Sequence, residues 1–349
     1  MSTVRKSVKK STMMFIMSIM AITIVFMLAA FIVTVSYFLS KPEKATGVML
    51  ASGETIYTEE ELNNLIVERE DVATEEMLTY IRGELEEGRS TTSILQELYP
   101  QQTVLARKGK YHFFDLNPSL STNIYDDDAF SVDENGILSY NNGETTSKKG
   151  IDVSRYQGAI DWSKVKSEGV EYALIRVGYR GYGSSGKLVM DETFEENIEG
   201  ALENGIDVGV YFLSQAINEE EAIEEAEYVL EAIRGYDITY PVVIDVEEIT
   251  TDTARTDDLT KEQWTKNCIA FCETIEEAGY TPMIYGNLTT FFFLLDMEQL
   301  EEYEKWVAWY GTPIYFPYKF TIWQYTDEGT VDGIDSDVDL NVGFYDPTK

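Results

Sequence analysis

The chain has 349 residues and an ordinary apolar fraction of 44%, which is enough for one large domain with a sizeable core and a smaller additional segment. Its formal net charge of −35 is extreme, and such a negative field repels DNA, RNA and anionic lipid headgroups. Composition and charge therefore exclude a nucleic-acid partner and leave the fold open.

The N-terminus combines a basic cluster with a long apolar run. The first forty residues hold four basic residues and no acidic one, so the rest of the chain carries 23 Lys and Arg against 62 Asp and Glu, a charge of −39. Residues 13–39 are apolar except for Ser and Thr. As a helix they would span about 40 Å, more than the roughly 30 Å hydrocarbon core of a bilayer. The run is also longer than the apolar segment of a signal peptide, which has about 7–15 residues. We therefore expect an uncleaved transmembrane helix over residues 13–39, a cytoplasmic basic tail over residues 1–12, and an extracytoplasmic location for everything that follows.

Residues 40–149 are predicted to form a juxtamembrane region. Helical spacing of apolar residues predicts a helix over residues 58–87, and Thr58 followed by Glu61 is typical of a capping box at its start. Three more short elements are predicted, a helix over 92–98 and strands over 104–106 and 111–114. From Pro118 to Lys149 the chain is polar and rich in turn residues, which predicts a linker.

Residues 150–349 alternate between short apolar strands and amphipathic helices. The predicted strands cover residues 150–154, 172–177, 208–213, 242–246, 283–285, 307–309, 321–325 and 338–340. The predicted helices cover residues 193–204, 219–234 and 259–278, with Asn218 as the N-cap of the second and a glycine after each C-terminus. Repeated βα units favour parallel strands covered by helices, and the number of strands favours a closed barrel that lacks helices late in the chain.

Acidic residues at strand ends are the candidates for chemistry, because a β/α barrel builds its active site at the C-terminal ends of its strands. Asp245 and Glu247 close the apolar strand that starts at Val242, and two residues apart they point to the same face. Two partly desolvated carboxyl groups raise each other's pKa, so one can stay protonated and donate to a leaving oxygen while the other is charged. Glycosidic cleavage requires such a pair.

Two further acids and several aromatic residues belong to the same pattern. Asp152 and Asp339 lie on two other predicted strands. A single acid at a strand end is explained as well by a structural role, as a helix cap or a loop anchor, as by a catalytic one. Acids on three strands of one barrel favour a catalytic site. Sugar rings stack on aromatic faces, and aromatic residues near the strand ends are Tyr156, Tyr179, Tyr211, Phe212, Tyr285, Trp309, Tyr310, Trp323 and Tyr325. Taken singly, each of these is better explained as a core residue.

The two cysteines do not indicate a metal site. Cys268 and Cys272 lie four residues apart in a predicted helix, and the single histidine, His112, is distant in the sequence. A structural zinc site needs about four such ligands. We therefore interpret the cysteines as helix residues of which at least one is buried, and we expect no metal and no cofactor.

Five segments in this order resemble glycoside hydrolase family 25, the Chalaropsis-type lysozymes, over essentially residues 150–345. The segments are Gly150-Ile151-Asp152-Val153-Ser154 with Gln157-Gly158, Gly209-Val210-Tyr211-Phe212, Asp245-Val246-Glu247, Met283-Ile284-Tyr285-Gly286, and Ile322-Trp323-Gln324-Tyr325-Thr326 leading into Val338-Asp339-Leu340-Asn341. The resemblance implies an α/β fold, an irregular TIM-like β/α barrel with eight strands and fewer helices. It also implies hydrolysis of the β-1,4 bond between N-acetylmuramic acid and N-acetylglucosamine in peptidoglycan.

The resemblance also implies roles for individual residues. Glu247 matches the proton donor, and Asp245 matches the partner carboxylate, which acts either as nucleophile or by positioning the acetamido group of the substrate. Asp152 and Asp339 match two further carboxylates of the site. Positions that line the substrate groove are matched by Tyr211, Tyr285, Trp323 and Gln324.

Together these observations predict a single-pass membrane protein whose catalytic barrel, residues 150–349, hydrolyses peptidoglycan glycan strands outside the cytoplasmic membrane of a bacterium. A non-catalytic wall-binding scaffold on the same barrel and a hydrolase of another polysaccharide are the alternatives. Residues 40–149 lie outside the resemblance. A spacer is the simplest interpretation of them, and a wall-binding or regulatory module is the alternative.

Overall fold

The computed structural model describes residues 48–49 and 55–347, and the chain divides into two compact units, residues 1–98 and 99–349. The transmembrane helix predicted over residues 13–39 lies outside the described residues. Within the described part, no helix combines the length and the apolar character needed to cross a membrane.

The first unit contains the two helices predicted from the sequence. Strands β1 (Val48–Met49) and β2 (Thr55–Ile56) pair antiparallel, and helices α2 (Glu59–Glu86) and α3 (Thr91–Leu98) follow. The predicted capping box is confirmed, since the Glu61 N–H donates to the Thr58 hydroxyl (3.2 Å) and the Thr58 N–H donates to the Glu61 carboxylate (2.8 Å).

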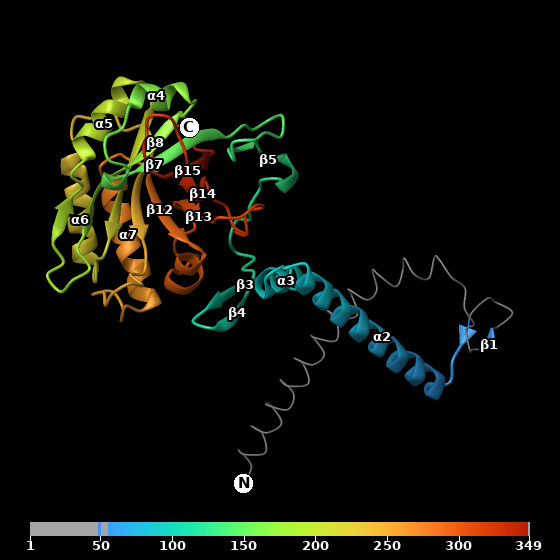
Figure 1. The fold of residues 1–349 in the computed structure, drawn as a ribbon. Helices are drawn as coiled ribbons and strands as arrows, with labels where there is room; N and C mark the ends of the chain where they lie inside the picture. The colour runs from blue at the N-terminus through green and yellow to red at the C-terminus, as the bar shows by residue number, and fades with distance from the viewer. Residues whose placement is uncertain (1–47, 50–54, 348–349) are drawn as a thin grey trace, which may run out of the picture. The chain divides into compact units, whose positions relative to one another are not determined.

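The second unit is built on a closed barrel (Figure 1). Within residues 99–347 eight strands close it, in the order β7 (Lys148–Val153), β8 (Tyr172–Arg180), β10 (Asp207–Ser214), β11 (Val242–Val246), β12 (Pro282–Asn287), β13 (Glu304–Ala308), β14 (Ile322–Gly329) and β15 (Val338–Gly343). All neighbours are parallel except β15, which is antiparallel to β14 and to β7. Strand β9 (Leu188–Met190) adds an antiparallel edge to β8. The predicted eight-stranded irregular barrel is confirmed.

Helices cover only part of this barrel. They are α4 (Trp162–Ser167), α5 (Phe194–Glu203), α6 (Glu219–Ala232) and α7 (Lys261–Glu277), followed by a π-helical turn, η3 (Thr290–Leu294). Asn218 caps α6 as predicted, because its side chain accepts from the Glu221 N–H at 2.9 Å. The connections between β13, β14 and β15 contain no helix. The elements α4, β9 and η3 were not predicted because three to six residues are too few to show a periodic pattern.

Residues 99–149 pack against the barrel instead of forming the linker that was predicted over Pro118 to Lys149. This segment forms two hairpins, β3 (Gln102–Arg107) with β4 (Lys110–Asp115) and β5 (Phe130–Val132) with β6 (Leu138–Tyr140). Leu120 and Leu138 join the core of the barrel, and the Tyr125 ring stacks on Phe344 at 3.7 Å. The prediction was wrong here because a few apolar residues, scattered among many polar ones, are enough to anchor the segment.

Gly150 provides room for an aromatic ring inside the barrel. A Cβ atom at Gly150 would lie 2.1 Å from Cζ of Tyr172, which is fully buried and stacks on Tyr240. Overpacking such a site costs about 1–3 kcal/mol, so we expect Gly150→Ala to lower the free energy of unfolding by this amount in urea denaturation. Gly183→Ala is the control, since its Cβ would meet nothing within 4 Å. Equal losses in the two variants would contradict this account.

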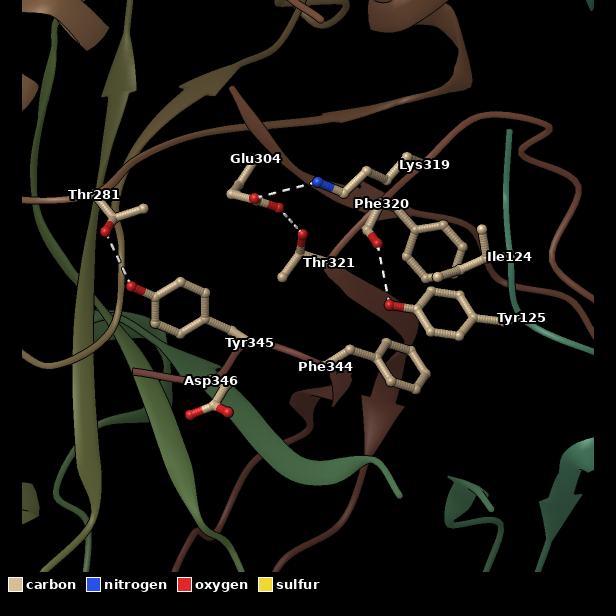
Figure 2. A pocket seen from close by; sticks show the side chains of 10 residues that line it. All are labelled: Ile124, Tyr125, Thr281, Glu304, Lys319, Phe320, Thr321, Phe344, Tyr345 and Asp346. Carbon is tan, nitrogen blue, oxygen red and sulfur yellow. Dashed lines mark hydrogen bonds and ion pairs between the residues drawn. The ribbon is translucent and has the colours of Figure 1, made fainter. Parts of the chain in front are cut away.

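A cavity of about 350 Å³ lies at the end of the barrel where the parallel strands begin (Figure 2). Thr281 and Thr321 directly precede β12 and β14, and Glu304 is the first residue of β13. The polar groups in Figure 2 are largely satisfied by one another: the Tyr345 hydroxyl donates to Thr281 at 3.0 Å, and Lys319 pairs with Glu304 at 3.5 Å. Because Thr281, Glu304 and Thr321 precede or begin parallel strands, the cavity lies at the opposite end of the barrel from the predicted catalytic residues.

Candidate active site

The barrel brings the four predicted carboxylates to one end. Asp245 and Glu247 lie at and just beyond the end of β11, and Asp152 is the penultimate residue of β7. Asp339 is the second residue of β15, and it pairs directly with Asp152 because β15 runs antiparallel. A residue near the start of this strand therefore reaches the end of the barrel where the parallel strands finish. The cluster is close enough that Glu247, Asp152 and Asp339 all raise the pKa of Asp245.

Two side-chain amides fix Asp152. Its Oδ2 accepts from Nδ2 of Asn341 (2.7 Å) and from Nε2 of Gln324 (3.0 Å). The amides are oriented in turn, because Trp306 Nε1 donates to Asn341 Oδ1 and the Tyr285 hydroxyl donates to Gln324 Oε1, each at 2.8 Å. The Asp152 carboxylate is thus held in one geometry by neutral donors, which suits a positioning role more than proton transfer.

Asp245 and Glu247 differ in their surroundings. Asp245 is 6% exposed, and its buried Oδ1 has no hydrogen-bond partner among the described residues. Glu247 is half-buried, and its backbone carbonyl accepts from Nε2 of Gln215 at 3.2 Å. Burial, then repulsion by Glu247 and Asp152, raises the pKa of Asp245 well above its usual range, and burial raises the pKa of Glu247. The pair can therefore hold a proton where an exposed carboxyl group would be ionised, as a general acid must.

Protonated carboxyl groups in the fold predict a stability that falls as the pH rises. Burial is the main cause that raises the pKa of Asp152 to about 6, Glu225 to about 7 and Asp339 to about 8, above the value of about 4 for unfolded acids. Between these values the folded chain binds more protons than the unfolded chain, so the free energy of unfolding decreases with pH. We expect a higher Tm at about pH 5 than at about pH 8 in thermal melts, and a smaller difference in Asp339→Asn. A Tm that rises over this range would be inconsistent with the raised values.

Trp323 is the one predicted site residue that the structure does not bring to the cluster. It is fully buried in the core outside the barrel, 5.3 Å from the Phe130 ring, and its Nε1 donates to the Trp309 carbonyl at 2.7 Å. Neighbouring residues on a strand point to opposite faces, so the inward position of Gln324 forces Trp323 outward. Tyr211 and Tyr285 do face the interior, where both pack on Trp306.

Arg176 is a residue of the site that the sequence analysis missed. It lies on β8 and is 7% exposed, and its Nε donates to Oδ2 of Asp191 at 2.7 Å. Its positive charge lowers the pKa of Asp245 against the larger raising effects. The available signal was an arginine inside the apolar strand predicted over residues 172–177, since a buried charge needs a partner or a task.

The cysteines are structural. Both are buried free thiols in α7, which confirms the interpretation of at least one as a buried helix residue. Within the described ranges, no group of three or more His, Cys, Asp and Glu side chains is arranged to hold a metal ion.

Comparisons with known proteins match this barrel. A family model described as "Glycosyl hydrolases family 25" matches residues 151–334. The chain is 28% identical to the uncharacterized protein YegX of Escherichia coli O6:H1, over 70% of this chain and 84% of that protein, and 29% identical to lysozyme M1 of Streptomyces globisporus, over 57% and 68%. The autolysin LytC of Streptococcus pneumoniae, solved in complex with a synthetic peptidoglycan ligand, aligns with a TM-score of 0.51 at 27% identity, over 69% of this chain and 56% of that chain.

Proposed function

The chain belongs to glycosyl hydrolase family 25 and is a glycoside hydrolase, and from this premise we propose that it is a membrane-anchored N-acetylmuramidase of bacterial peptidoglycan. The observation that carries the proposal is the pair of Asp245, which is buried, and Glu247, which is half-buried, both with raised pKa values, among four carboxylates at the catalytic end of the barrel. A lysozyme and an autolysin solved with a peptidoglycan ligand are among its relatives, which supports the β-1,4 bond after N-acetylmuramic acid as the target.

The proposed chemistry divides between the two carboxyl groups. Glu247 donates its proton to the glycosidic oxygen as the bond from that oxygen to the anomeric carbon breaks. Asp245, ionised, stabilises the positive charge that develops on the sugar, either by bonding to the anomeric carbon or by holding the acetamido group that does so. Water then completes the hydrolysis, with Glu247 now accepting its proton. Tyr211 and Tyr285 lie in the interior beside this pair, with both pKa values raised by burial first and in part by Asp245.

Hydrolysis is tested by incubating the full-length chain with purified cell walls and measuring new reducing ends. Release of reducing ends that follows enzyme concentration supports the proposal. Binding to walls with no release would instead favour a non-catalytic scaffold, and release only from a different polysaccharide would favour a hydrolase of another substrate.

The membrane anchor is the second part of the proposal. Residues 13–39 are apolar and follow four basic residues, which supports a single-pass orientation with the N-terminus in the cytoplasm and the barrel outside. The chain is expected to stay in the membrane fraction under alkaline extraction. In intact protoplasts, the barrel of the chain is expected to be accessible to added protease. Extraction into the soluble fraction, or protection from protease, would contradict the anchor or its orientation.

A further inference from the structure

The roles proposed for the catalytic pair require a specific distribution of one proton. Glu247 must hold the proton and Asp245 must be charged when the glycosidic bond breaks. The surroundings of the two side chains favour the opposite arrangement. Asp245 is 6% exposed and its Oδ1 accepts no hydrogen bond from the described residues, whereas Glu247 is half-buried. A charge on Asp245 therefore needs a group that stabilises it.

Arg176 is positioned to be that group. It lies on β8 opposite Tyr211 of β10, and Tyr211 lies opposite Val243, two residues before Asp245 on β11. Its side chain thus projects to the same interior, from a strand that is separated from the catalytic strand by β10 alone. The charged and titratable groups that interact with Asp245 are Glu247 on its own strand, Asp152 of β7, Arg176 of β8, Tyr211 of β10, Tyr285 of β12 and Asp339 of β15. Among these groups, all of them described residues, Arg176 is the one that carries a positive charge.

The Arg176 guanidinium group is hydrogen-bonded at Nε, whereas its Nη2 is left without a partner among the described residues. Nε is held by Asp191, whose carboxylate also accepts from the backbone N–H groups of Thr193 (3.0 Å) and Arg155 (3.1 Å). The guanidinium carbon lies 5.1 Å from the centre of the Tyr156 ring. Nη2 is buried and has no hydrogen-bond partner among the described residues. A buried, unsatisfied donor on a cation is costly unless it has a task, and Asp245 Oδ1 is an unsatisfied buried acceptor of the same interior.

We propose that Arg176 is a positioning residue that holds Asp245 as the ionised member of the catalytic pair and so keeps the proton on Glu247. This inference rests on the proposed function for its consequence, the rate of bond cleavage. The electrostatic relation itself is a property of the chain without substrate. Asp191 takes part by fixing the guanidinium so that the charge is delivered in one geometry.

The variants Arg176→Met, Arg176→Lys and Arg155→Met test the effect on cleavage. In Arg176→Met the positive charge is lost, so the apparent pKa of the acidic limb in the profile of kcat against pH is expected to rise by about one unit. A neighbouring opposite charge shifts a carboxyl pKa by roughly that much or more. Arg176→Lys keeps a charge and is expected to restore most of the profile. Arg155 is the matched control, since it is exposed and its guanidinium also lies over Tyr156, at 5.2 Å. An unchanged limb in Arg176→Met, or an equal shift in Arg155→Met, would overturn the proposal.

A titration without substrate separates this inference from the proposed function. The full-length Glu247→Gln chain and the double variant with Arg176→Met are compared by NMR titration of the Asp245 carboxyl carbon. Asp245 is expected to titrate about one pH unit higher in the double variant, whether or not the chain cleaves peptidoglycan. The same pKa in both would refute the role of Arg176. If the Met variant does not fold, Arg176→Gln, which also removes the positive charge, replaces it in the Glu247→Gln background.

Discussion

Glu247→Gln is expected to lower kcat for reducing-end release from purified walls by about a thousandfold, within the range that a positioned general acid contributes. Glutamine has nearly the same shape but no proton of suitable acidity to donate to the leaving oxygen. Because Glu247 is half-buried and its side chain is a source of repulsion toward Asp245, the variant is expected to fold normally and to melt at an equal or higher temperature.

Glu248→Gln is the matched control for this experiment. Glu248 is the next residue along the chain, but its carboxylate pairs with Arg107 at 2.5 Å and belongs to the surface. Its loss is expected to change kcat by no more than a few fold, since exposed ion pairs contribute about 1 kcal/mol or less. Activity that survives in Glu247→Gln, or that disappears equally in Glu248→Gln, would show that the assignment of the acid is wrong.

Asp245→Asn is expected to have opposite effects on activity and stability. Activity should fall by about a thousandfold, because the charged partner of the acid is lost. Stability should rise, because the substitution removes a buried carboxyl group whose Oδ1 is unsatisfied and which Glu247 and Asp152 repel.

The pH dependence makes this prediction specific. A raised pKa means that the Asp245 carboxyl group costs stability only as the pH rises above its unfolded value. The Tm of Asp245→Asn should therefore exceed that of the parent chain by a few degrees at about pH 8 and should match it at about pH 4. An inactive variant that is also less stable at the higher pH would indicate that Asp245 supports the fold, and would remove the argument that its burial serves catalysis.

The catalytic strand was predictable because local signals agree there. Val242 to Val246 is an apolar run that starts after Pro241 and ends among acids, and the structure has β11 over those residues. The spacing of Asp245 and Glu247 then follows from the two-residue period of a strand. The predicted strands also indicated Asp152 and Asp339. The sequence did not indicate that Asp339 lies near the start of an antiparallel strand, because that direction depends on how the barrel closes.

Other parts of the site depend on packing that a sequence pattern does not contain. Trp323 and Gln324 are adjacent, and either could face inward from the pattern Ile-Trp-Gln-Tyr alone, because a shift of one residue exchanges the two faces of a strand. The role of Asn341 arises only when β15 closes the barrel against β7 and its amide meets Asp152. Arg176 gains its meaning from Asp245, which lies about seventy residues away in the sequence and on a different strand.

The most direct test of muramidase activity is mass spectrometry of the fragments that the chain releases from purified peptidoglycan. We expect disaccharide-containing fragments whose reducing end is N-acetylmuramic acid, and we expect none of them when Glu247→Gln replaces the parent chain. Fragments that end in N-acetylglucosamine, or cleavage confined to peptide bonds, would contradict it.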